Sequence, residues 1–116
     1  MTPRFKENIV DTIELHELQR LLDERSPVRV VMTMGARRYA QAHIPGTETF
    51  DSIEAAFAAL HHDEEIVVYC TGGSCPSSRW AYHLLRSHGF THVRLFAGGL
   101  IAWDAAELPL AGEMAA

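Results

Sequence analysis

The chain has 116 residues, a hydrophobic fraction of 47% and a formal net charge of −5 at pH 7. This length suits one packed core, and we predict a single domain over residues 1–116 with its core from about 9 to 110. A net negative charge attracts neither nucleic acid nor an anionic membrane, so we expect neither partner. No apolar run resembles a signal peptide or a membrane span, and we expect a cytoplasmic location.

The first part of the chain predicts a helix followed by a strand. In residues 11–25 three leucines share one helical face, and Asp11 with Glu14 resembles a capping box. Residues 28–34 (VRVVMTM) are rich in β-branched and apolar side chains and predict a buried strand. The segment 35–46 is expected to be a loop or a short helix that the Pro-Gly pair closes.

The middle of the chain predicts a second helix and a second buried strand. Residues 47–50 form a short strand candidate, and Asp51 with Glu54 again resembles a helix cap. An apolar stripe then follows the helical period, at Ile53, Ala56, Phe57 and Leu60. Residues 66–70 (IVVYC) read as a strand that ends at Cys70.

The last third continues the alternation of helix and strand. A helix is predicted to start at Pro76 and to stop at Gly89, followed by a strand over 93–97 and a short helix over 100–106. This alternation predicts an α/β fold with a central, mostly parallel sheet and helices on both faces. Ligands bind beyond the carboxyl ends of the strands in such sheets, and Cys70 lies at such an end.

The stretch VVYCTGGSCPSSRW (67–80) holds both cysteines of the chain and predicts a reactive thiol. A thiolate needs its charge stabilised, and a glycine-rich turn followed by a helix start can point several backbone N–H groups at one sulfur. We therefore predict Cys70 as the catalytic nucleophile. The predicted substrate-binding residues are Thr71, Gly72, Gly73, Ser74 and Cys75 of the loop and Arg79 of the helix. The positive charge of Arg79 would attract an anionic substrate. The alternatives are a cysteine that merely packs and a solvated arginine.

Three segments, in this order, resemble the rhodanese family of sulfurtransferases: YAQAHIPGT (39–47), IVVYC with its glycine loop, and GFTHVRLFAGGLIAWDAAELPL (89–110). The resemblance covers nearly the whole chain and implies a single rhodanese-like domain. It also implies a persulfide on Cys70 that moves sulfur from a donor such as thiosulfate to cyanide or a thiol. The acceptor can be a small molecule or a protein thiol, and no metal or organic cofactor is needed.

The chain departs from the family pattern in two places besides Cys75. Met32, Thr33 and Met34 stand where an Asp-x-Arg pattern usually ends the preceding strand, so the rim is either organised differently or more apolar, which would alter the acceptor. The loop CTGGSCP is one residue longer than usual, as in related phosphatases and arsenate reductases. Pro76 occupies the position of their oxyanion-binding arginine, which disfavours phosphatase activity.

Cys75 leaves alternative functions open. Its thiol could attack a persulfide on Cys70, release sulfide and form a disulfide, which describes a dithiol redox or arsenate-reductase-like enzyme. The structural alternative is that Cys75 is simply a small residue near a helix start. If one of the two cysteines is dispensable for activity, we expect it to be Cys75. The absent Asp-x-Arg pair slightly favours a non-catalytic interaction module, against which the retained Cys70 counts. The seven histidines show no spacing typical of a zinc site, so no metal is predicted.

Overall fold

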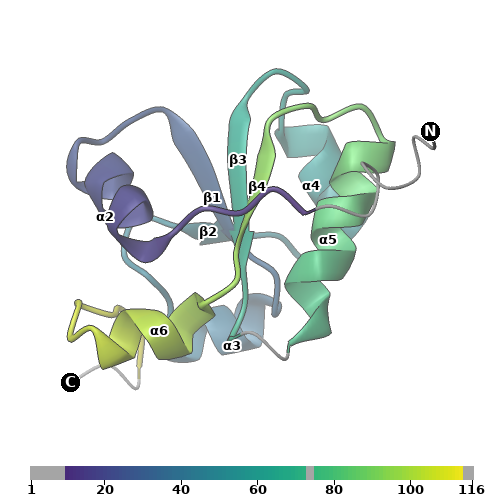
Figure 1. Ribbon diagram of the computed structural model, residues 1–116. Coiled ribbons are helices and arrows are strands. Elements are labelled where there is room, and N and C mark those ends of the chain that lie inside the picture. Colours follow the sequence, from purple (N-terminus) through teal and green to yellow (C-terminus); the bar gives the residue numbers. More distant parts are fainter. Residues whose placement is uncertain (1–9, 73–74, 114–116) are drawn as a thin grey trace.

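A computed structural model describes residues 10–72 and 75–113 of the chain (Figure 1). Four strands in these ranges form one sheet with the order β2-β1-β3-β4, and each neighbouring pair is parallel. The strands are β1 (Val28–Met32), β2 (Glu48–Thr49), β3 (Glu65–Tyr69) and β4 (Val93–Phe96). The helices are α2 (Leu15–Asp23), α3 (Ala36–Gln41), α4 (Ile53–Ala59), α5 (Pro76–Ser87) and α6 (Gly99–Ala105). Within the described ranges, none of the helices is long and apolar enough to cross a bilayer.

The two central strands are buried on both faces. Because side chains alternate along a strand, Val31 and Val68 pack with α4 and α5, whereas Val30 and Val67 pack with α2 and α6. Figure 1 shows these two helix pairs on opposite sides of the sheet. The predicted α/β fold, with a parallel sheet and helices on both faces, is therefore confirmed.

The predicted cap of the first helix is wrong by three residues. The segment at Asp11 runs beside β4, where Leu95 accepts a hydrogen bond from the Ile13 amide and donates one to the Asp11 carbonyl. This backbone pairing holds the chain extended, so α2 begins only at Leu15. Its N-cap is Glu14, whose carboxylate accepts a hydrogen bond from the Glu17 amide at 3.0 Å.

The cap of α4 also differs from the sequence prediction. Ser52, and not Asp51, is the N-cap, and its hydroxyl accepts a hydrogen bond from the Ala55 amide at 3.1 Å. Either residue type suits an N-cap, so the choice depends on where the helical backbone starts.

The glycine pair before α6 lets this helix touch the end of β3. The Leu100 and Ile101 amides donate to the carbonyl oxygens of Cys70 and Thr71, at 3.0 and 2.9 Å. Gly99 has φ +60°, and a Cβ there would lie 2.7 Å from the Thr71 carbonyl oxygen. The backbones of α6 and the residues after β3 therefore approach closely at this pair, and this contact fixes the loop that begins at Cys70.

Gly99→Ala should therefore destabilise the protein more than a glycine-to-alanine change at a position where the backbone has a positive φ but the new Cβ has free space. Gly35 is the matched control, because it has φ +90° and a Cβ there would meet nothing within 4 Å. We expect Gly35→Ala to lower the free energy of unfolding by about 1–3 kcal/mol. Gly99→Ala should cost at least about 2 kcal/mol more, since a clash is added. Urea unfolding measures both, and equal losses would contradict the close contact.

Candidate functional site

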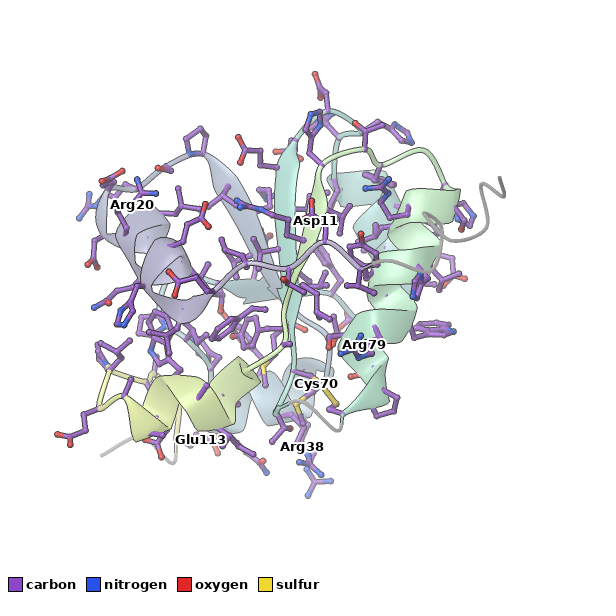
Figure 2. The ribbon with its side chains drawn as sticks, in the orientation of Figure 1. Asp11, Arg20, Arg38, Cys70, Arg79 and Glu113 are labelled. Atoms are coloured by element: carbon purple, nitrogen blue, oxygen red, sulfur yellow. A yellow bond between two sulfur atoms is a disulfide. The ribbon has the colours of Figure 1, made fainter. Side chains whose placement is uncertain are left out.

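Cys70 is the first residue after β3 and lies at the carboxyl edge of the sheet, between α5 and α6 (Figure 2). Its side chain is 1% exposed. The sulfur lies 3.4 Å from the hydroxyl oxygen of Ser78, a buried residue in the first turn of α5. A sulfur at the carboxyl end of a parallel strand is thus held against the start of the following helix.

The structure joins the sulfur atoms of Cys70 and Cys75 in a disulfide, with the Cα atoms 6.5 Å apart (Figure 2). This Cα separation lies inside the range of ordinary disulfides. The five-residue spacing of the two cysteines and the turn between them bring both thiols to one place. The pair can therefore undergo thiol–disulfide chemistry within the loop.

The hydroxyl groups next to the two sulfurs differ in whether they can donate a hydrogen bond. Thr33 donates its one hydroxyl proton to the Tyr69 carbonyl at 3.2 Å. The Ser77 hydroxyl, 3.1 Å from the Thr33 oxygen, must then be the donor of that pair. Ser77 therefore presents a lone pair to the Cys75 sulfur at 3.3 Å. Ser78 is a hydroxyl that can donate to the Cys70 sulfur, which favours the thiolate form at Cys70.

The backbone of the loop supports only part of the predicted cradle of amides. The Cys75 amide was predicted to donate to the sulfur of Cys70. In this structure it donates instead to the Gly72 carbonyl at 3.0 Å. The Cys70 and Thr71 carbonyls face α6. Since N–H and C=O of a trans peptide point in opposite directions, the amides of Thr71 and Gly72 point away from α6.

The structure places the other predicted site residues as follows. The Thr71 hydroxyl contacts the Met34 sulfur at 3.0 Å, and a Cβ on the buried Gly72 would lie 3.2 Å from Ile101. Gly73 and Ser74 lie outside the described residues. Arg79 is exposed on α5 (Figure 2), and its guanidinium forms no ion pair with the residues that the structure describes.

Sequence reasoning missed three hydroxyl residues: Thr33, Ser77 and Ser78. A signal for two of them was available. A helix that begins at Pro76 puts the next two side chains in its first turn, beside the loop that precedes it. Thr33 follows the neighbouring strand β1, whose carboxyl end lies at the same edge of the sheet.

The tyrosine before Cys70 ties β3 to the Pro-Gly segment. The Ile44 amide donates to the Tyr69 hydroxyl at 3.1 Å. Thr47 gives its proton to the Ile44 carbonyl, so Tyr69 donates to the Thr47 oxygen at 2.9 Å. Burial raises the pKa of Tyr69 above its ordinary value, and the phenol stays protonated as this network requires. The strand that carries Cys70 is thereby anchored one residue before the thiol.

His43, the histidine of the Pro-Gly segment, braces this segment by contacts with Tyr39. Its Nδ1 lies 2.6 Å from the Tyr39 carbonyl oxygen, and the rings of His43 and Tyr39 stack with their centroids 3.7 Å apart.

In the described part of the chain, no group of three or more His, Cys, Asp or Glu residues is placed to hold a metal ion.

The comparisons with known proteins agree with this geometry. A family model described as "Rhodanese-like domain" matches residues 6–106. The chain belongs to the family of rhodanese-like domains. It is 30% identical over 96 residues to the thiosulfate sulfurtransferase GlpE of Pseudoalteromonas translucida, which covers 81% of this chain and 89% of that protein. The family and this relative support membership of a sulfurtransferase family.

Solved structures show the same fold. The Alr3790 protein from Anabaena sp. is 30% identical, with a TM-score of 0.77 over 86% of this chain and 80% of that chain. The BH2092 protein from Bacillus halodurans is 20% identical, with a TM-score of 0.83 over 97% of this chain and 84% of that chain. The second similarity shows that the fold persists where the sequences have diverged.

The Ser78 hydroxyl should lower the pKa of the Cys70 thiol, and Ser77 should not. In a Cys75→Ser background, Ser78→Ala should raise the thiol pKa, because the thiolate then loses a hydrogen bond, and a hydrogen bond to a charged group contributes about 1.5–3 kcal/mol. The rate of iodoacetamide alkylation, followed against pH, measures this pKa. Ser77→Ala is the matched control, and an equal shift in both variants would contradict the assignment of donors.

Proposed function

We propose that this rhodanese-like domain is a sulfurtransferase that carries sulfane sulfur as a persulfide on Cys70. The main supporting observation is the position of the Cys70 sulfur, 3.4 Å from the Ser78 hydroxyl in the first turn of α5. The helix start adds the positive end of the α5 dipole, and the Thr71 and Gly72 amides, which point away from α6, are further candidate donors. Membership of the rhodanese family supports the same chemistry.

The reaction proceeds in two displacements. The Cys70 thiolate attacks the outer sulfur of a donor such as thiosulfate, a new S–S bond forms, and the S–S bond of thiosulfate breaks with its electron pair leaving on sulfite. Cyanide or a thiolate then attacks the outer sulfur of the persulfide, and the electron pair of the broken bond returns to Cys70. Hydrogen-bond donors around the sulfur stabilise its negative charge in both steps.

The donor is a small sulfur compound, the acceptor is cyanide or a small thiol, and a protein thiol can replace the small acceptor. The exposed Arg79 guanidinium on α5 is a candidate to attract an anionic donor to the loop. The relative from Pseudoalteromonas translucida carries the name of a thiosulfate sulfurtransferase, and thiosulfate is therefore the first donor to test.

Reduced protein incubated with thiosulfate should take up one sulfur atom at Cys70. Intact-mass spectrometry should show nearly one added sulfur per chain for Cys75→Ser and none for Cys70→Ser, because only Cys70 has the stabilising donors. Release of an equal amount of sulfite is the second readout. Sulfur uptake by Cys70→Ser, or none by Cys75→Ser, would refute a persulfide on Cys70.

A second function, dithiol redox chemistry, is favoured by the disulfide between Cys70 and Cys75. In this reaction the Cys75 thiolate attacks the Cys70 sulfur of the persulfide, the S–S bond of the persulfide breaks, and hydrosulfide leaves with the electron pair. The product is the disulfide seen here. An external dithiol must then reduce it to restore both thiols.

The two functions differ in what the wild-type protein does after it is loaded with sulfur. If Cys75 resolves the persulfide, wild-type protein should release sulfide without an added acceptor and end as the Cys70–Cys75 disulfide. Cys75→Ser should hold its persulfide at least tenfold longer. Sulfide assay together with alkylation of free thiols measures both outcomes, and a wild-type persulfide as long-lived as that of Cys75→Ser would exclude the dithiol function.

A further inference from the structure

A cavity of about 200 Å³ lies on the sheet face that α4 and α5 cover. Its inner wall is apolar and buried, and consists of Val31, Ala56, Leu60, Val68, Ala81 and Leu85. Its outer edge includes the exposed residues Asp51, Ser52 and Trp80, so this edge faces solvent. The described loop residues Cys70, Thr71, Gly72 and Cys75 are not among the residues that line the cavity.

The size of the cavity suits a small organic ligand. Protein interiors leave few voids larger than a water molecule, which has a share of liquid volume of about 30 Å³. An apolar cavity of about 150 Å³ is enough to bind benzene. Two small residues, Ala56 of α4 and Ala81 of α5, leave the space open where larger apolar side chains would fill it.

One end of the cavity adjoins the reactive sulfurs. Ser77 lines the cavity, and its hydroxyl lies 3.3 Å from the Cys75 sulfur. In this structure the Cys75 sulfur is bonded to the Cys70 sulfur. The outer sulfur of a Cys70 persulfide would be bonded to the same Cys70 sulfur, so the two atoms are comparable in position. The Cys75 sulfur thus marks a position that this outer sulfur can reach, next to the cavity.

We propose that this cavity binds the organic part of the sulfur acceptor, and that the acceptor is a small thiol with an aliphatic or aromatic body that carries no negative charge. The proposal rests on the sulfurtransferase function proposed above. An apolar wall favours an apolar body. Among the described residues that line the cavity, Asp51 alone carries a charge at neutral pH, and its carboxylate at the mouth repels anionic acceptors.

The chemical step takes place at the Ser77 end of the cavity. The acceptor thiol loses its proton to solvent, and its sulfur attacks the outer sulfur of the Cys70 persulfide. The acceptor leaves as a persulfide, and the electron pair of the broken S–S bond returns to Cys70 as the thiolate. Trp80, 60% exposed at the mouth, offers an aromatic surface that covers the bound body of the acceptor.

The first test measures binding without catalysis. Benzyl alcohol is an unreactive stand-in for an aromatic thiol, and its titration should shift the ¹H–¹⁵N NMR signals of the lining residues of α4 and α5. Ala56→Leu fills the cavity and should weaken binding at least tenfold. Ala58→Leu makes the same change at an exposed position of the same helix and should leave binding unchanged. Ala81→Val is a milder filling variant if Ala56→Leu does not fold.

The second test measures transfer from persulfide-loaded Cys75→Ser protein in a single turnover. The concentration of benzyl mercaptan that gives half the maximal transfer rate should be at least tenfold below that of mercaptoacetate. Mercaptoacetate also carries its thiol on a CH₂ group, but its body is anionic. Adding Ala56→Leu should raise the half-saturating concentration of benzyl mercaptan at least tenfold and leave transfer to cyanide within twofold.

The outcomes separate this proposal from the function on which it rests. If thiosulfate loads no persulfide, the sulfurtransferase function fails, and binding of benzyl alcohol still decides whether the cavity takes such a ligand. If the persulfide forms but the cavity-filling variants change neither binding nor transfer, the acceptor site is refuted and the function stands. Equal half-saturation by benzyl mercaptan and mercaptoacetate would refute the proposed charge preference.

Discussion

The contact between the start of α6 and the end of β3 is the constraint on which the site depends. The Cys70 and Thr71 carbonyls accept hydrogen bonds from α6. This contact requires backbone to approach backbone, and Gly99 permits it because a Cβ there would collide with both residues. Once these carbonyls face α6, the geometry of the peptide turns the next two amides away from α6. A helix far along the chain therefore orients the loop that carries the thiol.

The charge environment of the loop follows from the end of β1. Where the family pattern has an acid and a base, this chain has Met32, Thr33 and Met34. Met32 is buried in the core, Thr33 joins the Tyr69 carbonyl to Ser77, and Met34 contacts Thr71. An ion pair would hold the loop by charge, but here neutral hydroxyl and thioether contacts hold it. Stabilisation of a sulfur anion then depends on hydrogen bonds and the α5 dipole.

Much of the fold could be predicted from the sequence, because buried parallel strands and amphipathic helices leave strong patterns in it. The cap of α2 could not, because Asp11 pairs beside β4, a contact between distant parts of the chain. The position of Cys70 at a strand end was also predictable. Its partner Ser78 was missed, since the direction in which a first-turn serine points depends on how α5 meets the loop. The sequence analysis left a disulfide between Cys70 and Cys75 open as an alternative, and the structure contains this bond.

The neutral residues after β1 also connect the thiols to the apolar cavity. Thr33 and Ser77 line the cavity at one end and form a chain of hydrogen bonds from the β3 backbone to the Cys75 sulfur. An arginine at this edge would both fill space and favour anionic acceptors. Without an arginine there, the cavity that we propose for the acceptor has apolar walls, and Asp51 is the one acidic or basic side chain among its described lining residues. Under the functions proposed above, the departure from the family pattern changes which acceptor fits, while the proposed nucleophile Cys70 keeps its contacts with α5 and α6.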